Sequence, residues 1–478
     1  MTDYVVGIDV GSTSVKVLAA ELDGTGVAVA SRRTPWANLN GGQAELDASV
    51  LVDLVFALIR ELDATLAARG PYRVVAAATS GMAEAGVVLD PIGAAKAPIM
   101  AWFDPRGGHE MAATPPEFRA EFPGRTGLPV GPMASFSKLL HLQARGIDLS
   151  DATFLNLPEF IAHALGAPRV AESSLVSRTG LIDQDTGELW HAAVEVLGLE
   201  SRILGARVDA GRTIGNITTD RVPQPFRGAQ LTIAGHDHLV SAAAAGATRG
   251  HQLYDSIGTA EALVQLSDKP LTFAARERLA TAGITTGRYP LPGLHALLAG
   301  TKAGLLMRRT LQLVGITDAE GRAQIDEAVM ALPATGALVE DALQVLGGEN
   351  RDGVLRITAR SDNLSPAELF GAVLRHGNDL CGELLAVMHR EIPTPTSTVL
   401  TGGWASMRSV VRARAEILPD IRVDTVEEGT AFGAAAFALW ACREHATFHD
   451  ATEDFLEHTH VGANDQGAND QGANDEGA

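Results

Sequence analysis

A pattern of strand, glycine-containing turn and returning strand occurs twice in this chain of 478 residues. Residues 8–13 read IDVGST and residues 255–260 read DSIGTA, and apolar, strand-like residues flank both segments. The repetition indicates a duplicated α/β chain in which each half opens with the same unit. A length of 478 residues also exceeds what a single hydrophobic core usually organises, so two or more domains are expected.

The first turn has the composition of a phosphate site. Gly11 lets the backbone approach a ligand closely, and Ser12, Thr13 and Ser14 offer hydroxyl and amide donors to phosphate oxygens. Asp9, at the exit of the strand, can hold Mg²⁺ through its water shell. An ordinary hairpin with a polar turn has the same local sequence and stays open as an alternative. The chain has no Gly-Lys pair and no GxGxxG that opens a helix, which excludes a Walker P-loop and disfavours a dinucleotide fold.

The residues after the first strand-turn-strand unit follow the order of an α/β domain. Apolar residues spaced by three and four positions predict a helix that begins near Asp47 and ends at Gly70. Residues 73–79 then read as a buried strand. In such arrangements functional side chains gather where strands end.

Three side chains that follow strands are candidates for binding a hydroxyl-bearing ligand. Glu84 lies in the loop after strand 73–79, and Trp102 and Asp104 follow a short apolar strand. The two carboxylates can accept hydrogen bonds from sugar hydroxyls, and solvated loop charges are the alternative. The hydroxyl-rich segment 171–190 suits a sugar-facing wall, although an ordinary serine-rich turn would look the same.

The sequence GHDH at residues 235–238 places Asp237 between a predicted strand and an alanine-rich helix. Backbone donors at a helix N-terminus can hold a carboxylate that projects into a cleft. A helix N-cap is the alternative, because Asp fills that position well. His236 and His238 also suggest a metal site, but no third ligand lies at a familiar spacing.

Two features mark the end of the chain. Gly402 and Gly403 follow a predicted strand at residues 398–400 and permit a flat ligand to lie against the backbone. Residues 462–478 repeat a Gly-Ala-Asn-Asp motif three times. Such a segment cannot bury apolar surface and is expected to be disordered.

Charge and cysteine content exclude several classes of partner. The formal net charge of −20 argues against nucleic acid or an anionic membrane surface. The two cysteines, Cys381 and Cys442, lie in apolar helix-like sequence, which favours buried thiols in a reducing compartment. A strand follows Met1 almost at once, and no apolar run reaches transmembrane length. We therefore expect a cytoplasmic protein that binds small molecules.

Four separated motifs resemble those of the FGGY family of carbohydrate kinases. They are GIDVGSTSVK at residues 7–16, GHDH at 235–238, DSIGT at 255–259, and LTGG at 400–403 with EGTAFGAA at 428–435. The resemblance implies duplicated actin-like ATPase domains of the ribonuclease H-like type, with a nucleotide and sugar cleft between them. The implied division is a domain at residues 1–245 with the sugar site, first phosphate loop and catalytic Asp, a domain at 246–455 with the second phosphate loop and adenosine site, and a disordered tail at 456–478.

The resemblance also implies a role for individual residues. Asp237 matches the catalytic aspartate of the family, and Ala83 and Glu84 match its paired sugar-contacting positions. The implied substrate site contains Ala83, Glu84, Trp102, Asp104, Asp237 and His238. The implied nucleotide site contains Asp9, Gly11, Ser12, Thr13, Ser14 and Lys16 from the first half and Gly258, Thr259, Gly300, Gly402 and Gly403 from the second, with Mg²⁺ at Asp9.

The implied reaction is phosphorylation of a primary hydroxyl of a small neutral sugar, with ATP and Mg²⁺. The chain is similar to the xylulokinase-like branch, which favours a pentulose such as D-xylulose. Xylulokinases usually have Met-His and glycerol kinases Arg-Glu where this chain has Ala83-Glu84, so another ketose or a polyol such as erythritol, xylitol or glycerol stays open. A non-catalytic sugar sensor would lack Asp9, Asp237 or a loop hydroxyl, and all are present. The oligomeric state is open, with a homodimer as one alternative.

Overall fold

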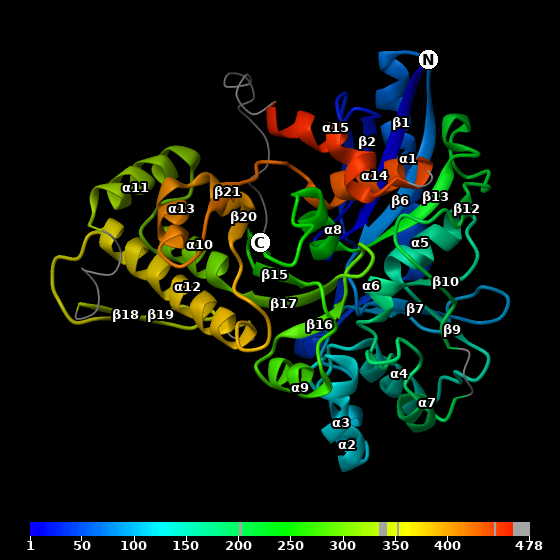
Figure 1. Ribbon diagram of the computed structural model, residues 1–478, viewed down its shortest axis with the longest axis horizontal. Helices are drawn as coiled ribbons and strands as arrows, with labels where there is room; N and C mark the ends of the chain where they lie inside the picture. Colours follow the sequence, from blue (N-terminus) through cyan, green and yellow to red (C-terminus); the bar gives the residue numbers. More distant parts are fainter. Residues whose placement is uncertain (200–202, 334–341, 351–352, 444–445, 462–478) are drawn as a thin grey trace.

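The computed structural model describes residues 1–199, 203–333, 342–350, 353–443 and 446–461. Two six-stranded sheets form the centres of two lobes (Figure 1). The first sheet has the strand order β12-β13-β6-β1-β2-β3, and the second has the order β16-β17-β15-β14-β20-β21. Helices cover both sheets, so the protein has the two-domain α/β architecture that the sequence predicts.

The first sheet is built from the amino-terminal half of the chain. β1 (Thr2–Val10) pairs antiparallel with β2 (Ser14–Glu21) and parallel with β6 (Tyr72–Gly81). β6 in turn lies parallel to β13 (Gln230–His236). The predicted meander and the predicted strand at 73–79 are therefore confirmed. The edge strands are β3 (Ala28–Arg33) and β12 (Gly215–Asn216).

The centre of the second sheet repeats this arrangement. β14 (Gln252–Ile257) pairs antiparallel with β15 (Glu261–Ser267) and parallel with β20 (Ser397–Thr401). β20 lies parallel to β21 (Ile421–Val423). The two sheets thus share one topology around their opening hairpins, which confirms the predicted duplication. The other strands of this sheet are β16 (Thr285–Arg288) and β17 (His295–Thr301).

The remaining elements connect and cover the two sheets. In the described residues no helix combines the length and apolar character that crossing a bilayer requires. The other helices are α1 (Ala48–Arg69), α2 (Gly108–Ala113), α3 (Pro116–Thr126), α4 (Ser135–Ala144), α5 (Leu157–Leu165), α6 (Ser173–Val176), α7 (His191–Val196), α8 (Asp237–Ala244), α9 (Phe273–Thr281), α10 (Ala303–Leu313), α11 (Ala319–Ala331), α12 (Pro366–Met388), α13 (Arg408–Ala415), α14 (Gly429–Cys442) and α15 (Phe448–Val461). The small strands are β4 (Ala37–Asn38), β5 (Ala44–Leu46), β7 (Gly86–Leu89), β8 (Ile99–Met100), β9 (Thr153–Asn156), β10 (Val170–Glu172), β11 (Ala206–Val208), β18 (Leu343–Leu346) and β19 (Arg356–Ala359).

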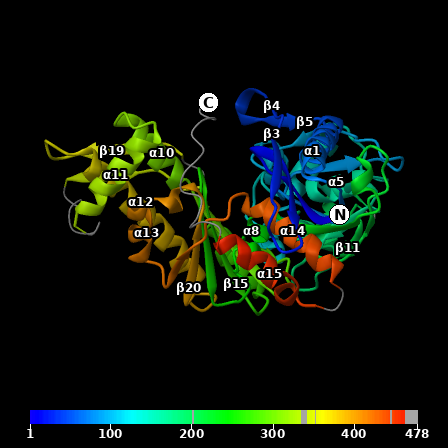
Figure 2. The ribbon, with the colours of Figure 1, turned by 90° about the horizontal axis from the view of Figure 1, so that it is seen from above.

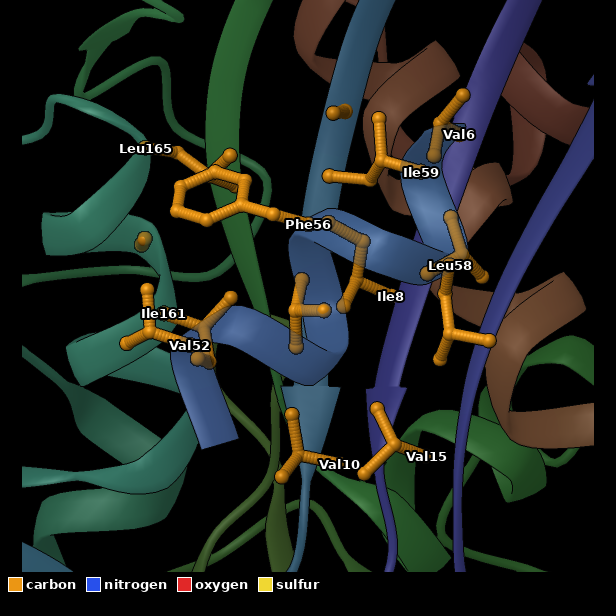
Figure 3. Packing of buried hydrophobic residues seen from close by; sticks show 14 of the residues in the cluster. Val6, Ile8, Val10, Val15, Val52, Phe56, Leu58, Ile59, Ile161 and Leu165 are labelled. Carbon is orange, nitrogen blue, oxygen red and sulfur yellow. The ribbon is translucent and has the colours of Figure 1, made fainter. Parts of the chain in front are cut away.

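Helix α1 shows how the first lobe forms its core. The Asp47 side chain accepts the N–H groups of the first turn and caps the helix, and Gly70 follows its end, as the sequence predicts. Phe56 and Ile59 of α1 are buried together with Ile8 of β1 (Figure 3). Each fully buried side chain of this size contributes about 1.5–3 kcal/mol to stability. This core holds β1 rigidly below the first turn.

The last helices of the chain pack against the first sheet. α14 packs against β1, β2, β6 and β13, and α15 packs against α14 (Figures 1 and 2). A Cβ on Gly7 of β1 would lie 1.9 Å from the carbonyl oxygen of Ala431, so glycine is needed for this close packing. The expected division at residue 245 therefore separates α14 from the sheet that it covers. The expected tail at 456–478 begins inside α15, and residues 462–478 lie outside the described residues.

Candidate active site

Three parallel strands of the first sheet end side by side and carry the predicted acidic residues. Asp9 at the end of β1 lies beside Ser80 of β6 in the sheet register. β6 lies beside β13, Glu84 follows β6, and Asp237 directly follows β13. Because the carboxyl ends of parallel strands share one edge of the sheet, the fold brings Asp9, Glu84 and Asp237 to the same place.

The turn between β1 and β2 is held by two residues from the segment after β3. The Thr34 hydroxyl donates to the Gly11 carbonyl oxygen at 2.6 Å, and the Trp36 indole N–H donates to the Ser12 carbonyl oxygen at 2.8 Å. The Gly11 N–H donates to the Ser14 carbonyl oxygen at 3.1 Å, which closes the turn. The turn is therefore more firmly anchored than an ordinary surface hairpin.

Asp9 lies next to Lys16 and Glu428. Lys16 is paired with Asp9 across the β1–β2 ladder, and its ammonium group forms an ion pair with Glu428, just before α14. Glu428 adopts a left-handed conformation with φ 58° and makes no capping hydrogen bond. Burial raises the pKa of Asp9 well above its usual value, Asp237 and Glu428 add to this rise, and Lys16 opposes it. Among the described residues Asp9 Oδ1 has no hydrogen-bond partner. This carboxylate oxygen is therefore available to bind a cation.

Asp237 is the first residue of α8, and His236 occupies the N-cap position. Asp237 Oδ1 accepts the His238 N–H at 2.7 Å and lies 3.2 Å from Nε2 of His236. Burial alone would raise the pKa of Asp237, but His238, His236, the His238 N–H and Arg178 together lower it below the ordinary value. Burial lowers the pKa of His236 to about 3. Asp237 is thus ionised near neutral pH, and its side chain stays 19% exposed.

Glu84 is hydrogen-bonded to residues outside its own loop. Its backbone is left-handed with φ 64°, and the Ser135 hydroxyl donates to its carbonyl oxygen at 3.0 Å. Arg178 Nε donates to Glu84 Oε1 at 2.6 Å, and both side chains are only 6% exposed. Burial raises the pKa of Glu84 and Arg178 opposes this rise, while Asp237 raises it further. Asp237 therefore lies close enough to influence both Glu84 and Asp9.

Asp104 is bonded within the protein. Its Oδ1 accepts the Arg106 backbone N–H and Nε, each at 2.9 Å. Its Oδ2 accepts the Ala44 N–H at 2.8 Å and Arg106 Nη2 at 2.6 Å, and the side chain is 0% exposed. The expected role of Asp104 as a hydroxyl ligand conflicts with this bonding, because both oxygens are already used. Asp104 instead fixes the loop that carries Trp102.

The two remaining sugar-side residues differ in their exposure. Ala83 is 1% exposed and belongs to the hydrophobic core around β6. Trp102 is partly exposed, and its ring centroid lies 5.5 Å from that of Phe103 in an edge-to-face arrangement. Trp102 therefore keeps surface that a ligand can contact.

Two glycines, Gly304 and Gly402, pack closely against the turn between β14 and β15. The Gly258 N–H donates to the Ala260 carbonyl oxygen at 3.0 Å. A Cβ on Gly304, in the first turn of α10, would lie 1.7 Å from the Gly258 carbonyl oxygen. A Cβ on Gly402, where φ is 92°, would lie 2.4 Å from the Ile257 carbonyl oxygen. These glycines gather the ends of β14 and β20 and the start of α10 at one edge of the second sheet.

The other residues predicted to bind the nucleotide differ in their exposure and in their place in the sheets. Thr259 and Gly403 are exposed at the same edge of the second sheet, and Thr13 is exposed in the first turn. Gly300 lies inside β17, where a Cβ would be 2.9 Å from the Glu261 carbonyl oxygen, so packing of the sheet accounts for this glycine. The structure thus assembles two groups of residues, one on each sheet, and Lys16 and Glu428 join the two halves of the chain.

Sequence reasoning missed several residues of this site. Arg178 lies in the hydroxyl-rich segment at 171–190, and Glu428 lies in a recognised motif, but neither was expected to form an ion pair in the site. Thr34 and Trp36 had no local signal, because their role is visible only once the turn is folded. In the described part of the chain no three His, Cys, Asp or Glu side chains gather as a metal cluster, so the two histidines beside Asp237 gain no third ligand.

Comparisons with known proteins agree on the family. The model of the FGGY family of carbohydrate kinases, N-terminal domain, matches residues 4–243. A glycerol kinase of Xanthobacter autotrophicus is 26% identical over 470 residues, covering 92% of this chain and 91% of the relative. The structure is similar to a xylulose kinase from Rhodospirillum rubrum, with a TM-score of 0.81 and 24% identity over 94% of this chain and 92% of that chain. Plasmodium falciparum glycerol kinase with ADP gives a TM-score of 0.81 and 17% identity over 95% of this chain and 92% of that chain.

Proposed function

This chain belongs to the FGGY family of carbohydrate kinases, and we propose that it transfers the γ-phosphoryl group of ATP to a primary hydroxyl of a pentulose such as D-xylulose. The chain is a sugar or polyol kinase, and the pentulose is the finer part of the proposal. The observation that carries it is the grouping of Asp9, Glu84 and Asp237 at one edge of the first sheet. These three carboxylates differ in environment, which lets them take different roles.

Asp237 is the proposed catalytic base. Its lowered pKa keeps it ionised near neutral pH, so it can accept the proton of the attacking hydroxyl. The hydroxyl oxygen forms a bond to the γ-phosphorus, the bond from that phosphorus to the bridging oxygen breaks, and ADP leaves. Glu84 and Trp102 are the proposed sugar contacts, with His238 at the rim beside the base. Glu84 accepts a hydrogen bond from a second hydroxyl and so aligns the first.

The two turns are the proposed phosphate sites. Ser12 and Thr13 of the first turn and Thr259 of the second present hydroxyl groups, and Gly258 lets the backbone approach a phosphate. Asp9 is the proposed magnesium ligand, supported by its buried Oδ1, which has no hydrogen-bond partner among the residues that the structure describes. When bound there, Mg²⁺ would neutralise charge on the phosphates of the nucleotide.

A second candidate substrate is a polyol of the glycerol, erythritol or xylitol type. It is supported by the 26% identity to a glycerol kinase over most of both chains. A cytoplasmic location is part of the proposal as well. It is supported by the two free cysteines, Cys381 and Cys442, because unpaired thiols persist in reducing compartments.

The test is ADP release from ATP and Mg²⁺ with a panel of D-xylulose, D-ribulose, xylitol, erythritol, glycerol and D-gluconate. We expect sugar-stimulated release that is largest with a pentulose and small without any acceptor. A strong preference for glycerol or another polyol would replace the pentulose by the second candidate. Equal ADP release with and without every acceptor would refute the assignment as a carbohydrate kinase with an acceptor of this size.

A further inference from the structure

We propose that Arg178 is a specificity residue of the sugar site, and that its guanidinium and the Glu84 carboxylate together bind two adjacent hydroxyl groups of the substrate. Arg178 acts as the donor and Glu84 as the acceptor. The substrate class that follows is a ketose or polyol with a vicinal diol in addition to the hydroxyl that is phosphorylated. This inference rests on the proposed function and names a feature that the acceptor must have.

The hydrogen bonds between the two side chains leave binding groups free. Arg178 Nε donates to Glu84 Oε1 at 2.6 Å, and Arg178 Nη2 lies 2.5 Å from the same oxygen. Both of these contacts go to Oε1, and neither uses Glu84 Oε2. A guanidinium carries five N–H groups, and the hydrogen bonds to Glu84 and Thr285 use two of them, while Nη2 is in ion-pair contact with Glu84. An acceptor oxygen and donor N–H groups are therefore available from one compact pair.

Arg178 is held in place by both halves of the chain. Its Nη1 donates at 2.9 Å to the hydroxyl of Thr285, which belongs to β16 in the second sheet. The hydroxyl of the neighbouring Ser177 accepts the Arg288 N–H at 3.2 Å. The guanidinium is thus positioned before any ligand binds, and such preorganisation lowers the entropic cost of recognition.

The pair lies beside the proposed base. Arg178 contributes to the lowered pKa of Asp237, and Asp237 raises the pKa of Glu84. Glu84 also keeps a left-handed backbone, with φ 64°, that a long side chain rarely adopts. Strain of this kind gathers at functional sites, whereas a buried ion pair by itself is weak evidence for stability.

The chemistry of a vicinal diol matches this arrangement. One hydroxyl can donate to Glu84 Oε2, and its neighbour can accept from an N–H group of Arg178. The positive charge of Arg178 also neutralises the negative charge of Glu84. The pair therefore distinguishes substrates by the arrangement of their hydroxyl groups, and it repels anionic substrates only weakly. A substrate that lacks one of the two hydroxyls leaves a buried polar group unpaired, which is the costly case for recognition.

The test compares kcat/KM for D-xylulose with its 3-deoxy and 4-deoxy analogues, and uses xylitol and its deoxy analogues where the polyol is the better acceptor. The enzymes are the wild type, Arg178→Lys, Arg178→Met and the double variant Arg178→Met/Glu84→Gln. The double variant removes both charges together, so a failure of Arg178→Met to fold does not end the test. ATP affinity is measured in every variant as the control.

For the wild type we expect kcat/KM to fall about 10- to 100-fold when one of the two hydroxyls is removed. Arg178→Met and the double variant should lose a similar factor with the parent sugar and should no longer distinguish it from the deoxy analogue. Arg178→Lys should retain part of the discrimination, because it keeps the charge and loses the planar fork.

Two results overturn the inference. One is a wild type that accepts both deoxy analogues as well as the parent sugar. The other is a uniform loss in the Arg178 variants with the parent-to-deoxy ratio unchanged, which a purely structural role of Arg178 would produce. Failure of the wild type to phosphorylate any acceptor is a different result, because it would refute the proposed function as well.

Discussion

Replacing Gly258 with valine should weaken ATP binding while leaving the fold intact. A Cβ at this position would meet only the Ala260 carbonyl oxygen, at an ordinary 3.5 Å, and the backbone is not left-handed. The change in the free energy of unfolding should therefore stay within about 1 kcal/mol. The branched side chain would occupy the space through which a phosphate approaches the turn. Loss of one charge-assisted hydrogen bond costs about 1.5–3 kcal/mol, so the Kd for ATP should rise about 10- to 150-fold.

The assay is titration calorimetry with ATP and Mg²⁺, combined with thermal unfolding of each variant. Gly131→Val is the matched control, because no atom lies within 4 Å of a Cβ at that position. It should change neither ATP affinity nor stability. Gly402→Ala is the opposite control, because its Cβ would lie 2.4 Å from the Ile257 carbonyl oxygen at φ 92°, and it should lower the unfolding temperature. A Gly258→Val variant that folds and binds ATP as tightly as the wild type would refute the role of the second turn.

Two further predictions concern stability and the first turn. Burial raises the pKa of Glu159 to about 8 and that of Glu172 to about 7, so the folded chain binds protons more tightly than the unfolded chain. The resulting stability is complete below the unfolded pKa of about 4 and is lost as the pH rises through 7 and 8. The unfolding temperature should fall across this range, and less steeply in Glu159→Gln; equal slopes would contradict the assignment. Thr34→Val removes the hydroxyl that donates to Gly11, and should raise the KM for ATP several-fold at a cost of about 1 kcal/mol in stability, whereas an unchanged KM would show that the anchoring of the turn is unimportant.

Short-range sequence patterns were sufficient to predict the ends of α1 and the two glycine turns. Asp47 and Gly70 mark the ends of α1 because capping depends on residues next to the helix. The two glycine turns were also predicted from neighbouring residues. Because the same turn sequence occurs twice, it indicated the duplicated topology. The position of Asp237 between a strand and a helix was also predicted from the local sequence, and α8 begins at this residue.

The features that were missed depend on contacts between distant residues. Arg178 and Glu84 are 94 positions apart, and Lys16 and Glu428 are 412 apart, so no local spacing connects them. The hydrogen bonds of Asp104 could not be predicted either, because its partner Ala44 belongs to β5, which is distant in the sequence. α14 is rich in buried alanine on all sides, and such a helix gives no indication of the sheet it will cover.

The central claim is that Asp237 is the base of a sugar-dependent phosphoryl transfer. The most direct measurement is the turnover number for sugar-stimulated ADP release by Asp237→Asn, with the exposed Asp148→Asn as the matched control. Asparagine keeps the shape of the side chain but cannot accept the proton, so turnover should fall about 10²- to 10⁴-fold. ATP affinity and the unfolding temperature should stay close to those of the wild type, and Asp148→Asn should be fully active. Near-normal turnover by a folded Asp237→Asn variant would contradict the claim.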